Sequence, residues 1–385
     1  MLSLDRDLIA GLRALLDDLQ YDAVQRTLRA NYFVRPFPAL EAFQKLTLNL
    51  PERQRVSYEV LLLGQPIRRE RLEALWGAGL VRSLLDLGLL EPADNLRLRT
   101  ANCSIVSYAG RYFVVTLNPS YPGSRDPDAT VYMGADSLTL AGHLLGPDGT
   151  RRFRRALDLC AGSGIQAILA ASFADEVQAV ELNPQAAHVA RFNALLNGVE
   201  DRVTVEEGNL FDAAPAGAYD LVVSNPPFIP VPAGVPFAMC GAGGEDGLVV
   251  LRPLLEGLPA RLAEDGLAII YAEGVGDAEG PFVRRLLTDQ TGVEHLDVRM
   301  VVTSRLSVKG ALVLRTLTLQ KLKRNVPIEL AQWRDLYPRQ DATHVFNYVL
   351  RIRRGSGRLT QFMAFDPHLE DRGFEIQPGV LIRPQ

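Results

Sequence analysis

Cysteine and histidine are both scarce in this chain of 385 residues, which has three cysteines and five histidines. The cysteines, Cys103, Cys160 and Cys240, are scattered and odd in number. Their positions give neither a disulfide framework nor the ligand spacing of a zinc site. The histidines are equally dispersed. We therefore expect no disulfide-stabilised fold and no metal site.

Long apolar runs are also missing. No run approaches the roughly 20 apolar residues that a membrane span needs. Residues 1–7 lack the basic start and the continuous apolar stretch of a signal peptide. We therefore expect a soluble, cytoplasmic protein. Hydrophobic residues make up 47% of the chain, which is enough for ordinary cores, and the length predicts two or three domains.

Residues 1–117 are predicted to form a mostly helical N-terminal domain. Apolar spacing predicts helices over 4–19, 39–46, 60–64, 69–76 and 81–87, then strands over 96–99 and 104–117, the second broken at Ala109-Gly110. Three helices followed by a hairpin suggest a winged-helix-like module. The plainer alternative is a helical domain for packing or substrate recognition. Residues 118–130, rich in Pro, Gly and Ser, are predicted to be a linker.

The most informative segment is Asn225-Pro226-Pro227-Phe228, here named the NPPF turn. It follows the apolar run Tyr219–Val223 and Ser224. Two consecutive prolines cannot continue a central strand, so a strand stops there. The Asn225 side chain and the Pro226 carbonyl are two hydrogen-bond acceptors, and Phe228 offers an aromatic face. Such a turn suits a planar NH2 group, which has two hydrogens and a flat surface.

Three earlier strand ends carry further signals. The strand 156–159 leads into residues 160–164, here named the glycine turn, and then into a helix. Glycines let a ligand approach the backbone, and a helix start offers free N–H groups. A second strand ends at Glu181, about 20 residues on, where a ribose-binding acid belongs. A third strand, 203–206, is followed by Asn209. Ligands bind at the carboxyl ends of strands in open α/β sheets, so one site is predicted.

With these motifs in this order, residues from about 130 to 275 resemble a class I S-adenosylmethionine-dependent methyltransferase. The NPPF turn resembles that of N-methyltransferases that act on exocyclic amines of nucleobases or on glutamine amides. The resemblance implies an α/β, Rossmann-like domain over 131–320, with S-adenosyl-L-methionine as cofactor, followed by a basic α+β extension over 321–385. Residues 131–145 resemble the helix that precedes the first strand and closes over the cofactor.

The resemblance also implies roles for single residues. Asp158, Gly162 and Gly164 would line the methionine part of the cofactor, and Glu181 would hold the ribose hydroxyls. Asn209 would lie near the adenine amine, where many relatives have Asp. Cys160 is expected to be a small packing residue of the glycine turn. The expected cofactor-binding residues are Asp158, Cys160, Gly162, Gly164, Glu181, Leu182, Asn209, Leu210 and Asn225.

The expected catalytic residues are Asn225, Pro226, Pro227 and Phe228. Asn225 Oδ1 and the Pro226 carbonyl would accept the two hydrogens of the target nitrogen and aim its lone pair at the methyl group. Phe228 would stack on the target plane. No strong base is needed, because the N–H becomes acidic once the nitrogen is methylated. The alternative is that Asn225 caps a loop and Phe228 belongs to the core.

Charge is distributed unevenly. Residues 298–360 contain thirteen Lys or Arg and three acids, a net +10, which leaves −14 for the remainder. A basic region with interleaved aromatics, Tyr337, Phe346 and Tyr348, could contact a nucleic acid, and the loop 353–358 is the best phosphate-contacting candidate. The alternative is that these arginines cover a sheet edge or neutralise the acidic domain. Residues 311–314 and 345–350 are predicted to be strands.

Three functional hypotheses follow. The first is methylation of an exocyclic base amine in RNA or DNA, which the basic region favours. The second is methylation of a glutamine amide in a protein. Residues 243–248, Gly-Gly-Glu-Asp-Gly-Leu, resemble the segment that follows the catalytic turn in methyltransferases that modify release factors, although they also suit a helix start before a helix ending near Ala263. The third is a scaffold without turnover, which the intact motifs disfavour.

Overall fold

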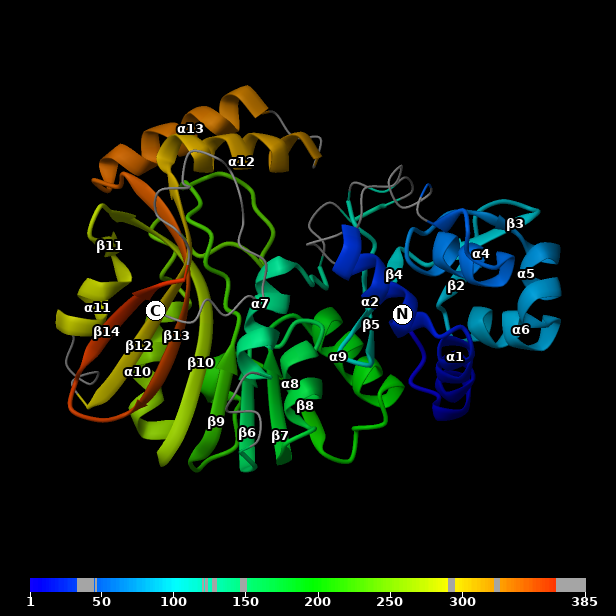
Figure 1. Ribbon diagram of the computed structural model, residues 1–385, viewed down its shortest axis with the longest axis horizontal. Coiled ribbons are helices and arrows are strands. Elements are labelled where there is room, and N and C mark those ends of the chain that lie inside the picture. Colours follow the sequence, from blue (N-terminus) through cyan, green and yellow to red (C-terminus); the bar gives the residue numbers. More distant parts are fainter. Residues whose placement is uncertain are drawn as a thin grey trace.

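The computed structural model describes residues 1–32, 45, 47–119, 121, 124–126, 130–145, 151–289, 295–321 and 326–364 (Figure 1). Its largest element is a nine-stranded sheet in the order β14-β12-β13-β10-β9-β6-β7-β8, with β11 paired to β10. Strands β6 to β10 run parallel, and β13 runs antiparallel between β10 and β12. The strands are β6 (Phe153–Leu159), β7 (Ala174–Glu181), β8 (Val203–Glu207), β9 (Tyr219–Ser224), β10 (Leu262–Asp277), β11 (Gly280–Pro281), β12 (Leu296–Ser307), β13 (His344–Arg354) and β14 (Leu359–Met363).

Helices cover both faces of this sheet, so its central strands are apolar on both sides. In β9, Leu221 and Val223 pack into one core, and Val222, between them, packs into the other. The first core lies under α7 (Ala135–Leu144), α8 (Ile165–Ala170) and α9 (Pro184–Leu196). The second lies under the short 3₁₀ helix η2 (Leu210–Asp212), α10 (Leu251–Arg261) and α11 (Val283–Asp289). This is the α/β, Rossmann-like architecture that the sequence predicts.

The N-terminal region is largely helical, as predicted, and it is carried beside the sheet (Figure 1). The predicted helix over 69–76 is found with the same bounds, whereas most of the helix predicted over 39–46 lies outside the described residues. Strands β1, β2 and β3 form a small sheet in the order β1-β3-β2, and β4 and β5 form a hairpin. The elements are α1 (Arg6–Asp18), α2 (Tyr21–Tyr32), α4 (Glu52–Leu61), β1 (Ile67–Arg68), α5 (Arg69–Trp76), α6 (Ala78–Asp86), β2 (Leu90–Pro92), β3 (Arg97–Thr100), β4 (Cys103–Tyr108) and β5 (Arg111–Thr116).

Asn193 of α9 and Asn197, the residue that follows this helix, join the N-terminal hairpin to the sheet domain. The Asn193 amide exchanges two hydrogen bonds with the backbone of Val114, at 2.8 and 3.0 Å. Asn197, one helical turn later, does the same with Tyr112, at 2.9 and 2.7 Å. All four bonds are buried. The two side chains therefore satisfy the edge of β5 as a neighbouring strand would, which a buried edge requires.

One strand prediction is wrong. Residues 311–314 belong to α12 (Val308–Lys321), which is followed by α13 (Val326–Arg339). Ala311 and Leu312 belong to an apolar cluster that also contains Trp333 and Tyr337 of α13. A four-residue apolar run has too short a pattern to distinguish a strand from a helix. The strand predicted over 345–350 lies within β13.

The C-terminal strands β13 and β14 belong to the same sheet as β6 to β10. A boundary at residue 320 therefore does not separate two sheets. Within the part of the chain that the structure describes, no helix combines the length and the apolarity needed to cross a bilayer.

The Asn197 contact gives a test of how the two regions are joined. Asn197→Ala leaves the N–H and C=O of Tyr112 buried without these partners, so we expect the free energy of unfolding to fall by about 2–4 kcal/mol. The matched control, Asn95→Ala, lies in an exposed loop and is expected to change stability by about 0.5 kcal/mol or less. Urea unfolding of both variants measures the difference. Equal stabilities would contradict this account of the junction.

Candidate functional site

The candidate site lies where the winding of the sheet reverses. From β6 the chain winds through β7 to β8, whereas β9 and β10 lie on the other side of β6. Leu159 at the end of β6 is paired with Ser224 at the end of β9. The glycine turn and the NPPF turn therefore leave the sheet side by side, at the position where open α/β sheets bind ligands.

The glycine turn leaves β6 and enters α8 with three residues at positive φ: Cys160 at 61°, Gly162 at 54° and Gly164 at 78°. A Cβ added to Gly162 would meet nothing within 4 Å, so this glycine faces open space. A Cβ on Gly164 would lie 3.2 Å from Cβ of Ala190, so this glycine lets α9 approach closely. Burial raises the pKa of the Cys160 thiol, which makes it a poor nucleophile.

Glu181, at the end of β7, is tied to the glycine turn. Its Oε2 accepts a hydrogen bond from Gly162 N, and its Oε1 accepts one from Asn183 N, both at 2.8 Å. Each carboxylate oxygen keeps further acceptor capacity for a ligand hydroxyl. The end of β8 is joined to the same place, because Gly208 N donates to the Glu181 carbonyl at 3.0 Å. Nearby, Leu182 is 56% exposed and Asn209 is also exposed.

Asp158, in β6, lies beneath the glycine turn and is only 2% exposed. Its Oδ2 accepts a hydrogen bond from Ala167 N in the first turn of α8, at 2.9 Å. Its Oδ1 is buried and has no hydrogen-bond partner among the described residues. Burial raises the pKa of this carboxyl to about 8; the Ala167 hydrogen bond lowers it, and the charge of Glu181 raises it further. Without a ligand this carboxyl keeps its proton at neutral pH, and a cationic ligand group beside the free oxygen would favour its ionised form.

Asn225 has one side of its amide bound and the other side free. Its Nδ2 donates to Asp136 Oδ2 at 2.7 Å and to Ser137 Oγ at 3.4 Å. Its Oδ1 is buried and accepts no hydrogen bond from the described residues. The side chain therefore caps no backbone group of the described loop. Phe228 is half-buried, with its ring 5.5 Å from that of Tyr271 at 58°.

Asp136 and Tyr132 are site residues that the sequence interpretation did not single out. Asp136 lies in the first turn of α7, and Tyr132 OH donates to its Oδ1 at 2.9 Å. The Tyr132 hydroxyl passes so close over Gly134 that a Cβ there would lie 1.7 Å from it. Asp136 and Asn225 are 89 residues apart, and no local pattern relates them. The available signal was an aromatic residue and a glycine before a helix, with an acid in its first turn.

The segment 241–248 runs along the back of the NPPF turn. Ile229 N donates to the Gly241 carbonyl at 2.8 Å, and Gly243 N donates to the Ile229 carbonyl at 2.9 Å. A Cβ on Gly243 would lie 2.7 Å from the carbonyl carbon of Phe228, and one on Gly247 would lie 2.5 Å from its oxygen. These glycines are needed because the two backbones touch. The segment thus supports the turn as well as leading towards α10.

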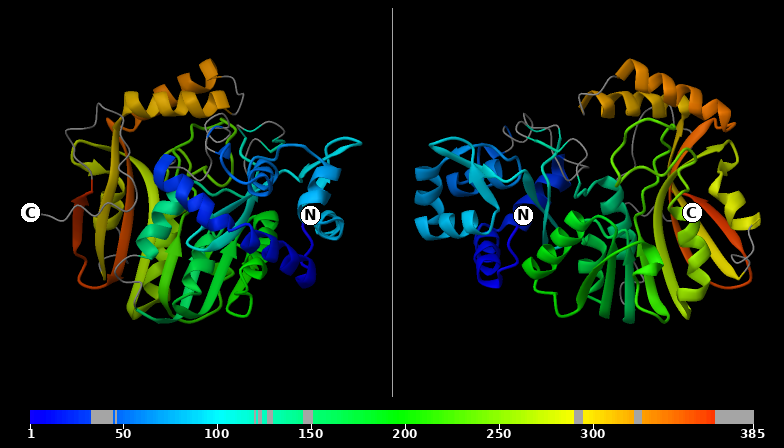
Figure 2. Two further views of the ribbon diagram at one scale, coloured as in Figure 1. Left: turned by 45° about the vertical axis from the view of Figure 1, so that its right-hand side comes forward. Right: turned by 180° about the vertical axis from the view of Figure 1, so that it is seen from behind.

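Helices α12 and α13 lie across the end of the sheet that carries the NPPF turn, in every view of Figures 1 and 2. Trp333 Nε1 donates to the Pro230 carbonyl at 2.7 Å, just after the turn. Several basic residues of 298–360 are engaged within the chain. Arg315 pairs with Glu273, Arg358 pairs with Asp297 at 3.6 Å, and Arg354 Nε donates to the Leu262 carbonyl at 2.9 Å. These contacts agree with the alternative that the arginines neutralise acids and cover a sheet edge.

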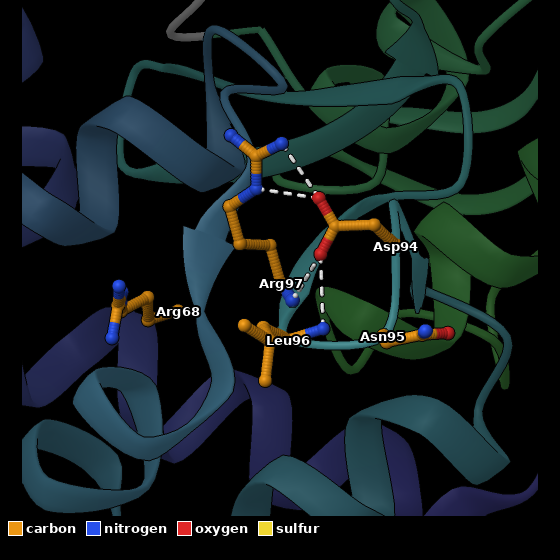
Figure 3. Close-up of a pocket in the computed structure, with 5 residues that line it drawn as sticks. All are labelled: Arg68, Asp94, Asn95, Leu96 and Arg97. Atoms are coloured by element: carbon orange, nitrogen blue, oxygen red, sulfur yellow. Dashed lines mark hydrogen bonds and ion pairs between the residues drawn. The ribbon is translucent and has the colours of Figure 1, made fainter.

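A surface hollow lies away from this site, on the small N-terminal sheet. Figure 3 shows its lining residues, Arg68, Asp94, Asn95, Leu96 and Arg97. Asp94 accepts hydrogen bonds from the backbone of Leu96 and Arg97 and from the Arg97 side chain. Its carboxylate is thus satisfied by its own turn, so the hollow does not compete with the strand-end site as a functional centre.

Comparison with known proteins supports this location. Residues 135–233 match the family model of the methyltransferase small domain. Over 126 residues the chain is 41% identical to a ribosomal protein uL3 glutamine methyltransferase of Bordetella pertussis, which covers 30% of this chain and 42% of that protein. The protein of the same name from Bradyrhizobium diazoefficiens is 39% identical over 137 residues, covering 33% and 42%. The chain thus spans under half the length of these relatives.

Among solved structures, ribosomal protein L11 methylase from Lactobacillus delbrueckii subsp. bulgaricus is 18% identical and has a TM-score of 0.32, covering 57% of this chain and 77% of that one. A likeness at this level carries no argument about function. The family match includes α7, the glycine turn and the NPPF turn, the three segments that form the site. Residues 135–233 of this chain therefore match the methyltransferase small domain, as the order of the motifs predicted.

Proposed function

We propose that this protein transfers a methyl group from S-adenosylmethionine to the side-chain amide nitrogen of a glutamine in a protein. The observation that carries the proposal is the Oδ1 of Asn225, which is buried beside the NPPF backbone and accepts no hydrogen bond from the residues that the structure describes. The names of the relatives that match this domain support the amide as target. A ribosomal protein is therefore the first substrate to test. This is the second of the hypotheses that the sequence left open.

The site fits the cofactor by its donors, acceptors and open space. Asp158 Oδ1 is free to meet a cationic group of the methionine part, and Gly162 leaves room for it above the backbone. Glu181 would accept from the ribose hydroxyls, and the exposed Leu182 would pack on the adenine ring. Asn209 and Leu210 would border the adenine, and Cys160 and Gly164 would shape the turn. When bound, the cofactor supplies an electrophilic methyl group.

The NPPF turn would orient the substrate rather than deprotonate it. An amide nitrogen is a poor nucleophile, because its lone pair is delocalised. If Asn225 Oδ1 and the Pro226 carbonyl accept its two hydrogens, the nitrogen is favoured in a pyramidal form with its lone pair towards the methyl group. Fixed acceptors also stabilise the positive charge that develops on nitrogen. The half-buried ring of Phe228 would stack on the amide plane, with Pro227 fixing the backbone between them.

An exocyclic nucleobase amine is the second candidate, because it presents the same two hydrogens and a flat face. The net charge of +10 over residues 298–360 is the observation in its favour. Arg315, Arg354 and Arg358 have partners within the chain, so fewer arginines of this segment are available to contact phosphates. The glutamine amide is therefore the better-supported target.

We also propose that residues 52–100 form a winged-helix-like module. Helix α4, strand β1, helices α5 and α6, and strands β2 and β3 follow in the order that such a module has, with β3 between β1 and β2. The module would act as a scaffold that holds the hairpin β4–β5 against α9. Asn193 continues this connection to the site, because its Nδ2 also donates to the Ser163 carbonyl at 2.9 Å.

The first prediction concerns Asn225. Asn225→Ala removes the free acceptor, so we expect methyl transfer to a glutamine-bearing protein to fall by about 100-fold or more. Affinity for the cofactor should change less than about twofold, because the contacts of the glycine turn remain. Transfer of labelled methyl groups and calorimetric cofactor titration measure the two quantities. Full activity in this variant would defeat the proposed mechanism.

The second prediction concerns Glu181. Glu181→Ala removes a charged acceptor and frees the N–H groups of Gly162 and Asn183, so cofactor binding should weaken by about 1–3 kcal/mol. Glu176→Ala is the matched control, because Glu176 lies near the opposite end of β7 with its side chain 77% exposed. Calorimetric titration compares the variants. Equal cofactor affinities of the two variants would contradict the proposal that Glu181 binds the ribose hydroxyls.

The third prediction concerns the pKa of Asp158. The folded protein, with this pKa near 8, keeps a proton that the unfolded chain releases near pH 3.8. Rising pH between these values therefore favours unfolding, by up to about 1.4 kcal/mol per pH unit. Asp158→Asn should remove this part of the pH dependence. Urea unfolding of the cofactor-free protein at pH 5, 6, 7 and 8 checks it, and parallel curves for the two proteins would contradict it.

A further inference from the structure

The orientation of the Asn225 amide is set by the Asp136 carboxylate, because the hydroxyl of Ser137, the other partner of Nδ2 at 3.4 Å, can donate as well as accept. An asparagine amide can turn by 180°, which exchanges its donor and acceptor ends with little change in shape. Only one orientation leaves Oδ1 free. In that orientation Nδ2 donates to Asp136 Oδ2 at 2.7 Å. In the other orientation two acceptor oxygens would face each other.

Asp136 is itself held in place from two directions. Tyr132 OH donates to its Oδ1, so both carboxylate oxygens act as acceptors. Asp136 also lies in the first turn of α7, where the helix dipole favours a negative charge. Gly134 allows the Tyr132 hydroxyl to reach this position, since any side chain at 134 would collide with it. Asp136 thus presents a fixed acceptor to Asn225.

We propose that Asp136 is a positioning residue for methyl transfer, which selects the orientation of Asn225 in which Oδ1, and not Nδ2, faces the target nitrogen. This rests on the proposed function, because it assumes a target that donates N–H groups. If the Asn225 amide were turned, the N–H donors of Nδ2 would face the N–H donors of the substrate. The lone pair of the target nitrogen would then no longer point towards the methyl group. Asp136 acts through Asn225 and needs no contact with the substrate.

The proposal is tested by exchanging the two side chains. Asn225→Asp alone puts two carboxyl groups face to face and should lower kcat by about 100-fold or more. Asp136→Ala should lower kcat by at least about tenfold with KM changed less than about threefold. The double variant D136N/N225D puts the amide donor on residue 136 and leaves an oxygen of residue 225 free. We expect its kcat to exceed that of Asn225→Asp by at least about tenfold.

If the losses of kcat from the two substitutions simply add in the double variant, the proposal is overturned. A merely structural Asp136 would give no recovery of kcat in that variant. Asp175→Asn, an exposed charge removal at the start of β7, is the control and should keep full activity. Cofactor affinity within about twofold of the parent shows that each variant is folded.

A second measurement needs no substrate. In the parent protein, the Nδ2 hydrogens of Asn225, assigned by their loss in Asn225→Asp, should exchange with water slowly by NMR. Asp136→Ala should accelerate this exchange at least about tenfold, and unchanged exchange would overturn the proposal. If exchange accelerates but the parent methylates no glutamine, the proposed function fails and the positioning of Asn225 by Asp136 stands.

Discussion

The pairing of the carboxyl ends of β6 and β9 is the constraint on which the site depends. The Leu159–Ser224 register places the glycine turn and the NPPF turn next to each other, although 60 or so residues of chain separate them. In the proposed function, the glycine turn would hold the cofactor and the NPPF turn the target nitrogen. Methyl transfer needs the two reacting groups in line and in contact, and such positioning contributes much of a catalyst's effect. Strands that are buried on both faces are rigid, so they can provide this positioning.

The rest of the molecule keeps these two turns fixed. The glycines of 241–248 allow a second backbone to lie against Phe228, and Trp333 of α13 donates to the Pro230 carbonyl. On the other side, Asn193 connects the glycine turn at Ser163 to β5 of the N-terminal region. The segments before and after the matched domain thus contribute contacts to it. The family match alone, over residues 135–233, does not contain them.

The sequence predicted the features that local patterns determine. Apolar runs ended by Gly, Glu or Asn-Pro-Pro located the strand ends, and their order predicted the Rossmann-like sheet. It could not predict the partner of Asn225, because Asp136 lies 89 residues away and an acid in the first turn of a helix is common. The strand predicted over 311–314 became part of α12, because packing against α13 decided an ambiguous pattern. The basic segment suggested phosphates, but its net charge could not show that Arg315 meets Glu273.

We propose above all that the Oδ1 of Asn225 accepts a hydrogen from a protein amide. The most direct test incubates the purified protein with methyl-labelled S-adenosylmethionine and, separately, a ribosomal protein fraction, total RNA and genomic DNA from cells that lack the protein. The label is then identified by digestion and mass spectrometry. We expect the label in a protein, as N5-methylglutamine. A methylated base in nucleic acid, with no label in protein, would contradict it.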